Sequence, residues 1–502
     1  MEVDMKHTKK LAWLLALLVL LGTSCNGEQN TAETDSEPSD DIAGAKTENE
    51  AETVDLSGMS FTERLSYTHL QWDDGLSDAD YGGSDCRVGY LDNQSDADHI
   101  LTDDWIAEEL TGEAIHDSVF NRNQTVADRF HVTMQMIPVL ASSFADTVSQ
   151  QVMADEDAYD LLVLHNASFA KLLYAGDFLR LDTLDALDFT KPWWCVDSVS
   201  SYAYDGRLYC ANGMATAVSM VGYTNAIFFN QDMAAEFALE NLYDVVREGR
   251  WTAEYFKKVC ADVYVDVNGD GKMDAGDRLG IHIPYGPVHG YVWNLGGKYV
   301  DAVDGTPTLQ IGTERMEKLY ETFRDMLTWE GVYQKKGWEP DIYKKGNTLF
   351  AQCCLTWGDG FRELDFASGI LPAFKLDETQ QFYTTGGGGS PQAILTTNRD
   401  PQRAAILMEA INAESYRQVI PAVYEQTARH KLAPDEDSTE MIDLIMEHLI
   451  FDGSFVFCPD ATYMLYDYGQ TNKGFASYMA EKAEMLSAAL ADNLAAFAEI
   501  GE

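Results

Sequence analysis

The stretch that decides the fold class runs from residue 87 to residue 164. It contains three strand-like segments, RVGYLD (Arg87–Asp92), HVTMQMIPV (His131–Val139) and YDLLVL (Tyr159–Leu164). Two helix-like segments separate them: Phe120–Phe130, and SSFADTVSQQVMA (142–154), where Ser142 or Ser143 is suited to cap the helix. Strands and helices that alternate over roughly eighty residues predict an α/β layer built on a mostly parallel sheet.

The same alternation continues through the rest of the chain. A second round begins near Val218, and a third begins with QAILTT (Gln392–Thr397) and the helix-like segment after it. A long segment rich in Ala, Leu, Met and Glu, from Phe475 to Phe497, predicts a final helix. The chain has 502 residues, of which 46% are hydrophobic, so it can form two or three compact units. No repeat of 20–50 residues is present, which argues against solenoids and propellers.

Charge narrows the classes of ligand. The chain has 82 acidic and 35 basic residues, which give a formal charge of −47. Such a surface repels nucleic acid and anionic lipid headgroups. We therefore expect no nucleic-acid partner.

The first 25 residues have the pattern of an export signal. A basic start is followed by an unbroken apolar segment, Leu11–Leu21, which is shorter than the ~20 residues that span a bilayer. Gly22-Thr23-Ser24-Cys25 resembles a bacterial lipobox, although Gly22 stands where an aliphatic residue is usual. We predict a signal peptide at 1–24 and a lipid anchor on Cys25 that holds the protein on the extracellular face of the cell membrane. An ordinary cleaved signal and a retained anchor are the alternatives.

Composition changes after Cys25. Residues 25–84 are mostly polar, acidic and poor in apolar side chains, so they cannot bury enough surface to fold. We predict that 25–84 is an acidic disordered tether. Its later part, SFTERLSYTHLQWDD, is more aromatic, and Trp72 could dock on the folded domain.

One local motif predicts a metal site. DVNGDGKMDAGD (266–277) fits the spacing of an EF-hand calcium loop, with an aspartate in place of the final glutamate. The ligands would be Asp266, Asn268, Asp270, Lys272 through its carbonyl, Asp274 and Asp277. RLGIHIPYG follows the loop and is strand-like, so we predict a structural Ca²⁺ that pins the end of a helix at Thr252–Val263, and no EF-hand sensor. The alternative is a solvated acidic turn.

Several longer segments resemble family 1 extracellular solute-binding proteins of ABC transporters. They occur in the family's order and cover nearly all of the chain after Cys86: 108–132 (EELTGEAIHDSVFNRNQTVADRFHV), 187–197 (LDFTKPWWCVD), 205–213 (DGRLYCANG), 225–256 (NAIFFNQDMAAEFALENLYDVVREGRWTAEYF), 266–280 (DVNGDGKMDAGDRLG) and 368–383 (SGILPAFKLDETQQFY). None of them is a catalytic signature.

The resemblance implies a two-lobed type II periplasmic-binding-protein-like fold, in which each lobe is a mostly parallel sheet flanked by helices. It implies a first lobe of residues 85–215 and 392–447 and a second lobe of residues 220–385 and 448–502. Hinge crossings are expected near Met214–Val221, Thr384–Ala393 and Leu449–Ser454. The run Gly386–Gly389 supplies backbone freedom at the second of these.

Candidate solute contacts combine aromatic rings with polar groups, because sugars present apolar faces and hydroxyl edges. The resemblance places a sugar-stacking tryptophan at Trp357, although this ring could instead pack against its own lobe. Asp359 and Arg362 lie on the same loop. His165 and Asn166 follow a strand, where open α/β sheets bind ligands. Tyr223, beside the first crossing, and Trp293, in the second lobe, complete the set.

The family implies that the protein captures a solute by lobe closure and delivers it to the permease subunits of an ABC importer. The solute would be a carbohydrate or a similar small molecule, the protein would be a monomer, and it would not be an enzyme. Two alternatives stay open: a secreted carbohydrate-active enzyme with a structural calcium loop, and a ligand-sensing surface protein. Incubation with oligosaccharides would separate the enzyme from the binding protein, because only the enzyme shortens them.

Overall fold

The first of the two larger sheets among the described residues combines the three strands predicted at residues 87–164 with a short later strand. The computed structural model describes residues 59–92, 100–285, 290–336, 340–361, 363–425 and 435–500. β1 (Ser84–Asp92) pairs in parallel with β2 (Val132–Leu140) and with β3 (Leu161–Val163), and β12 (Gln392–Ala393) runs antiparallel to β3. The predicted α/β layer with a mostly parallel sheet is confirmed here.

Helices surround this sheet. α7 (Val196–Tyr202) is the exception in this part of the chain, because it packs on β6 (Val300–Val303) and β13 (Leu449–Ile450). The surrounding helices are α3 (Ile100–Asp103), α4 (Ala114–Phe130), α5 (Phe144–Met153), α6 (Asn166–Tyr174), α15 (Pro401–Glu414) and α16 (Ile420–Tyr424). A π-helical stretch, Ser415–Val419, joins the last two. α4 begins at Ala114, six residues before the predicted Phe120, and its extra turns place Ile115 and Val119 on the packed face of the helix.

The second sheet has five strands in the order β10, β4, β9, β5, β8. Their bounds are β4 (Asn225–Asn230), β5 (Leu279–Tyr285), β8 (Val332–Lys336), β9 (Thr348–Cys354) and β10 (Ser368–Leu371). β5 is parallel to β8 and β9, but β4 runs antiparallel to β9 and β10. This sheet is therefore mixed, because the strand that enters from the first lobe runs against its neighbours. α9 (Gln231–Glu236), α10 (Leu242–Arg247), α11 (Ala253–Asp262) and α14 (Pro340–Lys344) pack around it.

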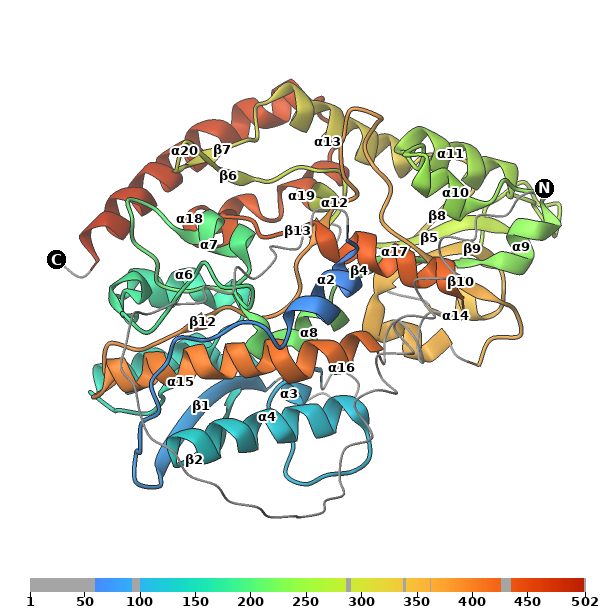
Figure 1. The fold of residues 1–502 in the computed structure, drawn as a ribbon. Helices are drawn as coiled ribbons and strands as arrows, with labels where there is room; N and C mark the ends of the chain where they lie inside the picture. The colour runs from blue at the N-terminus through green and yellow to red at the C-terminus, as the bar shows by residue number, and fades with distance from the viewer. Residues whose placement is uncertain are drawn as a thin grey trace, which may run out of the picture. The chain divides into compact units, whose positions relative to one another are not determined.

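A further group of elements adjoins the second sheet (Figure 1). It comprises α12 (Gly290–Asn294), the hairpin β6 (Val300–Val303) and β7 (Thr306–Leu309), α13 (Glu314–Met326), α18 (Ser454–Phe457), α19 (Met464–Gly469) and α20 (Phe475–Glu499). The predicted terminal helix is α20, whose start joins a buried cluster in which the Tyr320 and Phe475 ring centroids are 5.5 Å apart. At its far end, the carbonyl of Ile500 accepts a hydrogen bond from Tyr209, a residue before the first crossing. The terminal helix and the residue after it thus contact both the group beside the second sheet and the segment before the first crossing.

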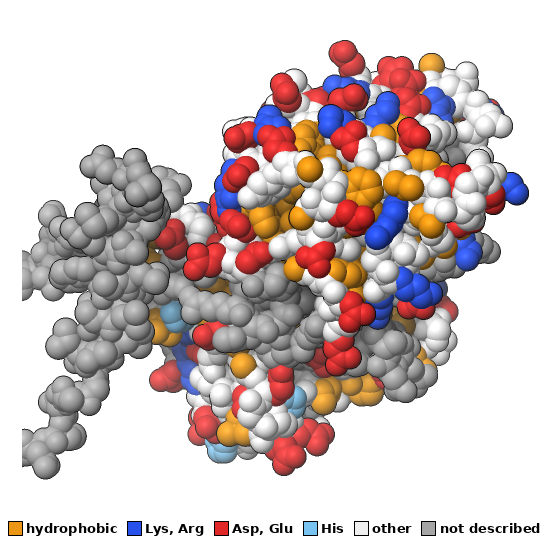
Figure 2. Space-filling model, turned by 90° about the vertical axis from the view of Figure 1, so that its right-hand side faces the viewer, with side chains coloured by type: hydrophobic (Ala, Val, Ile, Leu, Met, Phe, Trp, Pro, Cys, Tyr) orange, Lys and Arg blue, Asp and Glu red, His pale blue; other side chains and the backbone are white. Residues whose placement is uncertain are grey.

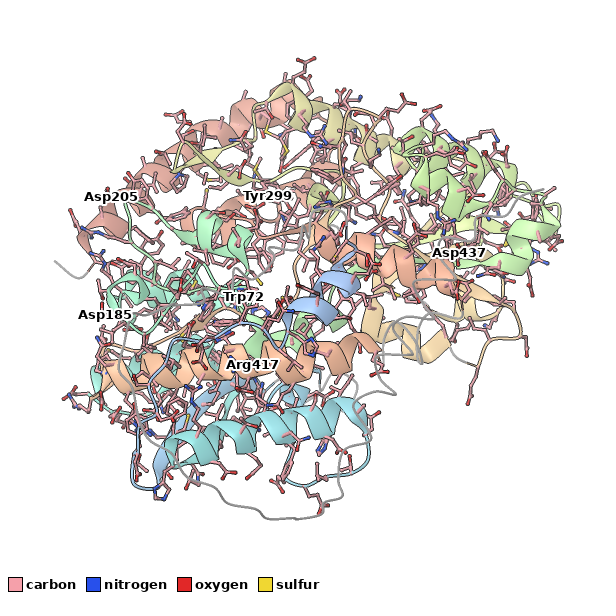
Figure 3. All side chains as sticks on the ribbon, viewed as in Figure 1. Trp72, Asp185, Asp205, Tyr299, Arg417 and Asp437 are labelled. Atoms are coloured by element: carbon pink, nitrogen blue, oxygen red, sulfur yellow. The ribbon has the colours of Figure 1, made fainter. Side chains whose placement is uncertain are left out.

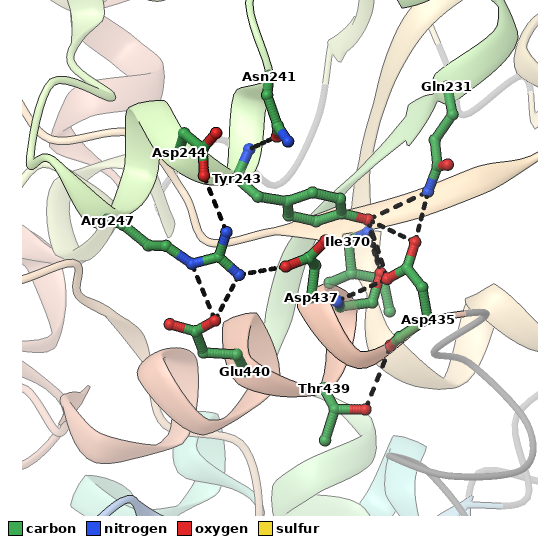
Figure 4. A network of polar contacts seen from close by, with 11 residues as sticks. Gln231, Asn241, Tyr243, Asp244, Arg247, Ile370, Asp435, Asp437, Thr439 and Glu440 are labelled. Carbon is green, nitrogen blue, oxygen red and sulfur yellow. Dashed lines mark hydrogen bonds and ion pairs between the residues drawn. The ribbon is translucent and has the colours of Figure 1, made fainter. Parts of the chain in front are cut away.

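α17 (Glu436–Glu447) corrects one predicted boundary. Residues up to 447 were expected in the first lobe, but α17 packs on β10 of the second sheet (Figure 4). The Ser438 hydroxyl contacts the Tyr243 hydroxyl at 2.8 Å and accepts a hydrogen bond from the Ile370 amide at 3.2 Å. The chain therefore passes between the lobes before α17, earlier than the predicted third crossing. An amphipathic pattern fixes which face of a helix is buried, but not which sheet buries it.

The part of the expected tether that the structure describes is folded. Residues 61–68 form α2 (Phe61–Thr68), which begins at a capping box: the Glu63 amide donates to the Ser60 hydroxyl and the Ser60 amide donates to the Glu63 carboxylate. The Trp72 ring lies under the ammonium group of Lys191 at 5.6 Å. Residues 25–58 of the expected tether, with the anchor at Cys25 and the signal at 1–24, lie outside the described residues.

The tryptophan pair of the family-like segment 187–197 has a structural role. Trp193 and Trp194 are buried, and their indole nitrogens donate to the two carboxylate oxygens of Glu409 at 2.8 and 3.0 Å. Glu409 is fully buried, and this desolvation raises its pKa to about 7 in spite of the two hydrogen bonds. These three side chains fix α15 to the loop before α7.

Charged side chains are intermixed on the face of the molecule that faces the viewer in Figure 2. Figure 2 shows acidic side chains spread over one face, with smaller basic and apolar groups between them. Among the described residues, no helix is both long enough and apolar enough to span a bilayer.

Candidate functional site

Two chain segments that join the lobes, residues 222–224 and 385–390, lie beside a third segment, residues 449–452, and we call the three the crossing layer. α8 (Ala217–Gly222) leads through the first segment into β4. β11 (Thr385–Gly386) pairs in parallel with β13 (Leu449–Ile450), so the second and third segments are hydrogen-bonded neighbours. The predicted crossing near Thr384–Ala393 and the segment predicted near Leu449–Ser454 thus meet in one layer.

The glycine run allows this close packing. A Cβ atom on Gly388 would lie 2.5 Å from the Met220 carbonyl oxygen, on α8. On Gly387 it would lie 2.4 Å from the ring of Phe451, which follows β13, and on Gly386 it would lie 2.4 Å from the ring of Trp293. Side chains at these positions would push the three segments apart, so glycine is required.

A buried carboxylate holds the third segment in place. Asp452 is 1% exposed and accepts four hydrogen bonds. The donors are Trp293 Nε1 at 2.9 Å, the Tyr299 amide at 2.7 Å, the Val300 amide at 3.1 Å and the Ser454 amide at 2.8 Å. The sequence analysis did not identify this residue; the only signal would have been its place in the predicted third crossing.

An ion pair also joins α7 to the segment just before β6. Asp197, on α7, accepts a hydrogen bond from Lys298 Nζ at 2.9 Å and another from the Phe451 amide at 2.7 Å. Lys298 lies just before β6 and is mostly buried. These contacts join the first lobe to the end of the crossing layer.

His165 and Asn166 lie at the edge of the first sheet nearest to this layer. They follow β3, and the Leu164 amide donates to the Pro391 carbonyl at 2.8 Å, directly after the glycine run. The His165 side chain is exposed, yet desolvation by the surrounding protein lowers its pKa. A neutral imidazole can both donate to and accept from a hydroxyl group. Asn166 begins α6, and its side chain lies outside the described residues.

Trp357 lies on the second lobe beside the first crossing. It belongs to a 3₁₀ segment, Leu355–Phe361, that follows β9, and the Leu355 amide donates to the Thr224 carbonyl at 2.9 Å. The Trp357 side chain is 44% exposed, whereas Trp251 in the same lobe is fully buried. The side chain of Asp359, on the same turn, and the whole of Arg362 lie outside the described residues.

Tyr223 and Trp293 border the crossing layer directly. Tyr223 caps α8 and is half-buried, next to Gly388. Trp293 is buried, with its ring 5.8 Å from that of Phe455. The structure therefore gathers Tyr223, Trp293 and Phe455 at the layer, whereas His165 and Trp357 each follow a strand of a different sheet whose end is hydrogen-bonded next to it. Phe455 was missed by the sequence analysis, because nothing in the sequence shows that α18 returns to this point.

The calcium-like loop lies apart from these residues, after α11. Asp266 accepts hydrogen bonds from the amides of Gly269 and Gly271 at 2.7 and 2.8 Å, and both glycines have positive φ angles, 71° and 76°. Asn268, Asp270 and Asp274 each accept one amide of the loop, from residues 270, 272 and 276. Asp277 is buried and accepts the amides of residues 267 and 274. Over the described part of the chain, no three acidic, histidine or cysteine side chains converge as a metal-binding group.

Comparison with known proteins identifies the fold. No family model matches the chain, and no curated protein sequence matches it. Solved structures do match. The sugar-binding protein MalE of Xanthomonas citri has a TM-score of 0.56 and 12% identity, over 83% of this chain and 100% of that one. The galacto-N-biose-/lacto-N-biose I-binding protein of a Bifidobacterium longum ABC transporter, in complex with lacto-N-biose, has a TM-score of 0.52 and 14% identity, over 83% and 98%.

A third match binds another kind of solute. UgpB of Mycobacterium tuberculosis, in complex with glycerophosphocholine, has a TM-score of 0.51 and 17% identity, over 75% of this chain and 96% of that one. The chain therefore has the two-lobed α/β fold of periplasmic-binding-protein-like substrate-binding proteins. The fold that the resemblance to family 1 extracellular solute-binding proteins implies is thus the fold observed, and several of the matching structures are sugar-binding proteins.

Proposed function

We propose that this chain is an extracellular solute-binding protein that captures a carbohydrate or a similar small solute and delivers it to the permease subunits of an ABC importer. The crossing layer carries the proposal, because segments packed through glycine join two sheets and can act as a hinge between them. A solute that touches both lobes stabilises the closed state. The protein would act as a monomer and would catalyse no reaction.

The site residues follow from the positions of the predicted contacts. Trp357 would stack on a sugar face, while His165 would hydrogen-bond hydroxyl groups from the opposite lobe. Tyr223 and Trp293 would form the floor, and Asn166, Asp359 and Arg362 stay candidate contacts from the sequence alone. An exposed indole on a turn beside the crossing layer supports the stacking role, since a core tryptophan would be covered.

A ligand screen tests the function. The purified protein is heated with oligosaccharides, amino acids, polyamines and glycerophosphodiesters in turn. A true solute at 100 times its Kd should stabilise the protein by roughly 2.7 kcal/mol. Shortened oligosaccharides would instead indicate an enzyme, and a screen in which no class of solute stabilises the protein would contradict the proposal.

We also propose that Cys25 is the lipid anchor. Cys25→Ser should leave the protein exported but release it from the membrane, because the acyl chains lose the thiol that carries them. Phase partitioning in detergent measures this, and Cys86→Ser, which alters a buried thiol, is the matched control. A Cys25→Ser protein that stays wholly in the detergent-rich phase would show that another element holds it.

We further propose that the loop at 266–277 binds a structural Ca²⁺. Its acidic side chains alternate along the loop, and Asp270 and Asp274 each keep an oxygen that takes no loop amide among the hydrogen bonds described. The single side-chain oxygen of Asn268 accepts the Asp270 amide and has a second lone pair for a metal ion. Those oxygens, the Lys272 carbonyl and the carboxylates of Asp266 and Asp277 would hold the ion, so binding requires the carboxylates to turn inward. Its role is in stability, because metal that binds only the folded state stabilises it.

Calcium removal tests that site. A chelator should lower the melting temperature by about 2–5 °C, and Asp270→Ala should abolish the difference between the calcium and chelator curves. Glu484→Ala, an exposed acidic residue on α20, is the control and should keep the difference. Identical curves for the unmodified protein with calcium and with chelator would rule out a calcium site.

A further inference from the structure

A segment at the base of the expected tether contacts both lobes, and we call residues 60–78 the strap. It consists of α2 and the extended residues after it (Figure 1). The capping box at Ser60 and Glu63 fixes the point at which the helix begins. The helical part of the strap therefore begins at a defined residue.

One group of strap residues contacts α17. The Thr62 hydroxyl donates to Asp443, and Arg64 Nη2 lies 3.1 Å from Glu447 Oε1. Asp443 is 8% exposed, and its contact with the half-buried Thr62 is partly shielded from solvent. Glu447 is the last residue of α17, and β13 of the crossing layer begins two residues later, at Leu449. The strap thus contacts α17 immediately before the chain enters the crossing layer.

A second group of strap residues contacts the first lobe. The hydroxyl groups of Thr68 and Tyr416 are 2.6 Å apart, and the rings of Phe61 and Tyr424 stack at 4.9 Å. Arg417 Nη2 donates to the Trp72 carbonyl at 2.7 Å, and Figure 3 shows these two residues close together.

Further along, the strap is fixed to the first lobe by charge. Asp74 pairs with Arg129 on α4, and with Arg417 at 3.6 Å. Asp74 is itself buried, and its hydrogen bonds and ion pairs lower its pKa in spite of that burial, so it stays ionised. This half of the strap therefore moves with the first lobe.

The two groups of residues that the strap contacts belong to different lobes. α17 is fixed to the second sheet through Ser438, and Arg247 on α10 pairs with Asp437 and Glu440 (Figure 4). The stretch that carries Tyr416 and Tyr424 packs on α4, which covers the first sheet. A rotation of one lobe against the other must therefore break the contacts on one side of the strap.

We propose that the strap is a clasp that couples the base of the tether to the opening and closing of the lobes, and that it stabilises the lobe arrangement seen here. The inference rests on the proposed function only in taking lobe rotation as the working motion. Release of the α17 side would free the hinge while the first-lobe side stays attached. Tension or docking at the tether would then alter solute affinity without contact with the solute.

Hydrogen exchange of the full chain in detergent, without any solute, tests the proposal. The double variant Thr62→Ala/Arg64→Ala removes the α17 contacts, together with the hydrogen bond from Arg64 to the Met59 carbonyl just before the strap. We expect amide exchange at residues 385–390 and 449–452 to rise by about 5- to 30-fold. Ser66→Ala, at an exposed position of the same helix, should leave it unchanged.

Equal exchange in the double variant and the unmodified protein would overturn the proposal. So would a rise of the same size in the central strands β1 and β9, because it would show a general loss of stability. Since the test needs no solute, a failed ligand screen would contradict the proposed function and leave this result standing.

Discussion

Trp357→Ala is expected to weaken solute binding by roughly 30- to 1000-fold, while the fold loses little stability. A stacked and buried indole at a binding hot spot contributes on the order of 2–4 kcal/mol, which corresponds to that loss of affinity. In the structure without solute the side chain is 44% exposed, so its removal leaves no large cavity. Calorimetric titration with the solute found in the screen measures the affinity, and thermal unfolding measures the stability.

A buried tryptophan of the same lobe provides the control. Trp251 is fully buried, and its indole nitrogen donates to the Pro372 carbonyl at 2.9 Å. Trp251→Ala should lower the free energy of unfolding by about 3–5 kcal/mol and leave the affinity of the remaining folded protein nearly intact. A Trp357→Ala protein that behaves in that way would remove Trp357 from the site without affecting the fold assignment.

Asp452→Ala is expected to lower the free energy of unfolding by about 3–5 kcal/mol, because it leaves four buried donors without their acceptor. Asp452→Asn should restore little of the lost free energy of unfolding. Oδ2 accepts from Trp293 and Tyr299 and Oδ1 accepts from Val300 and Ser454, so an amide group in either orientation faces two donors. Urea-induced unfolding measures the change.

The matched control for this change is Asp460→Ala, at an exposed aspartate eight positions further along the chain. It should alter the free energy of unfolding by less than about 0.5 kcal/mol. If Asp452→Ala also stays within that range, water must replace the carboxylate, and Asp452 would not anchor the crossing layer.

The sequence predicted the local elements well where apolar periodicity was strong. β1, β2, β3, α5, α11 and α20 all lie within a few residues of their predicted positions, because each has a clear apolar face. The prediction was weakest where structure depends on polar contacts. α2 is held by a capping box and by hydroxyl and ion-pair contacts with distant residues, so composition alone placed it in a disordered tether.

The site was only partly predictable. Trp357 and His165 could be proposed because each follows a strand, and strand ends are where α/β folds carry their ligands. Phe455 and Asp452 could not, since their roles depend on a chain segment that returns to the crossing layer about 160 residues after Trp293. The Ca²⁺ loop stays a prediction from spacing, because the donors of such a loop can be counted in sequence while their convergence cannot.

The sequence by itself determined the α/β class, the order of the elements, the acidic surface and the resemblance to solute-binding proteins, because composition, periodicity and motif order are local properties. Only the tertiary structure decided that α17 belongs to the second sheet, that β4 runs against its neighbours, and that glycines 386–388 press against three different parts of the chain. The physical reason is that an apolar face specifies burial without specifying a partner. Which partner buries it depends on the space that all other elements leave.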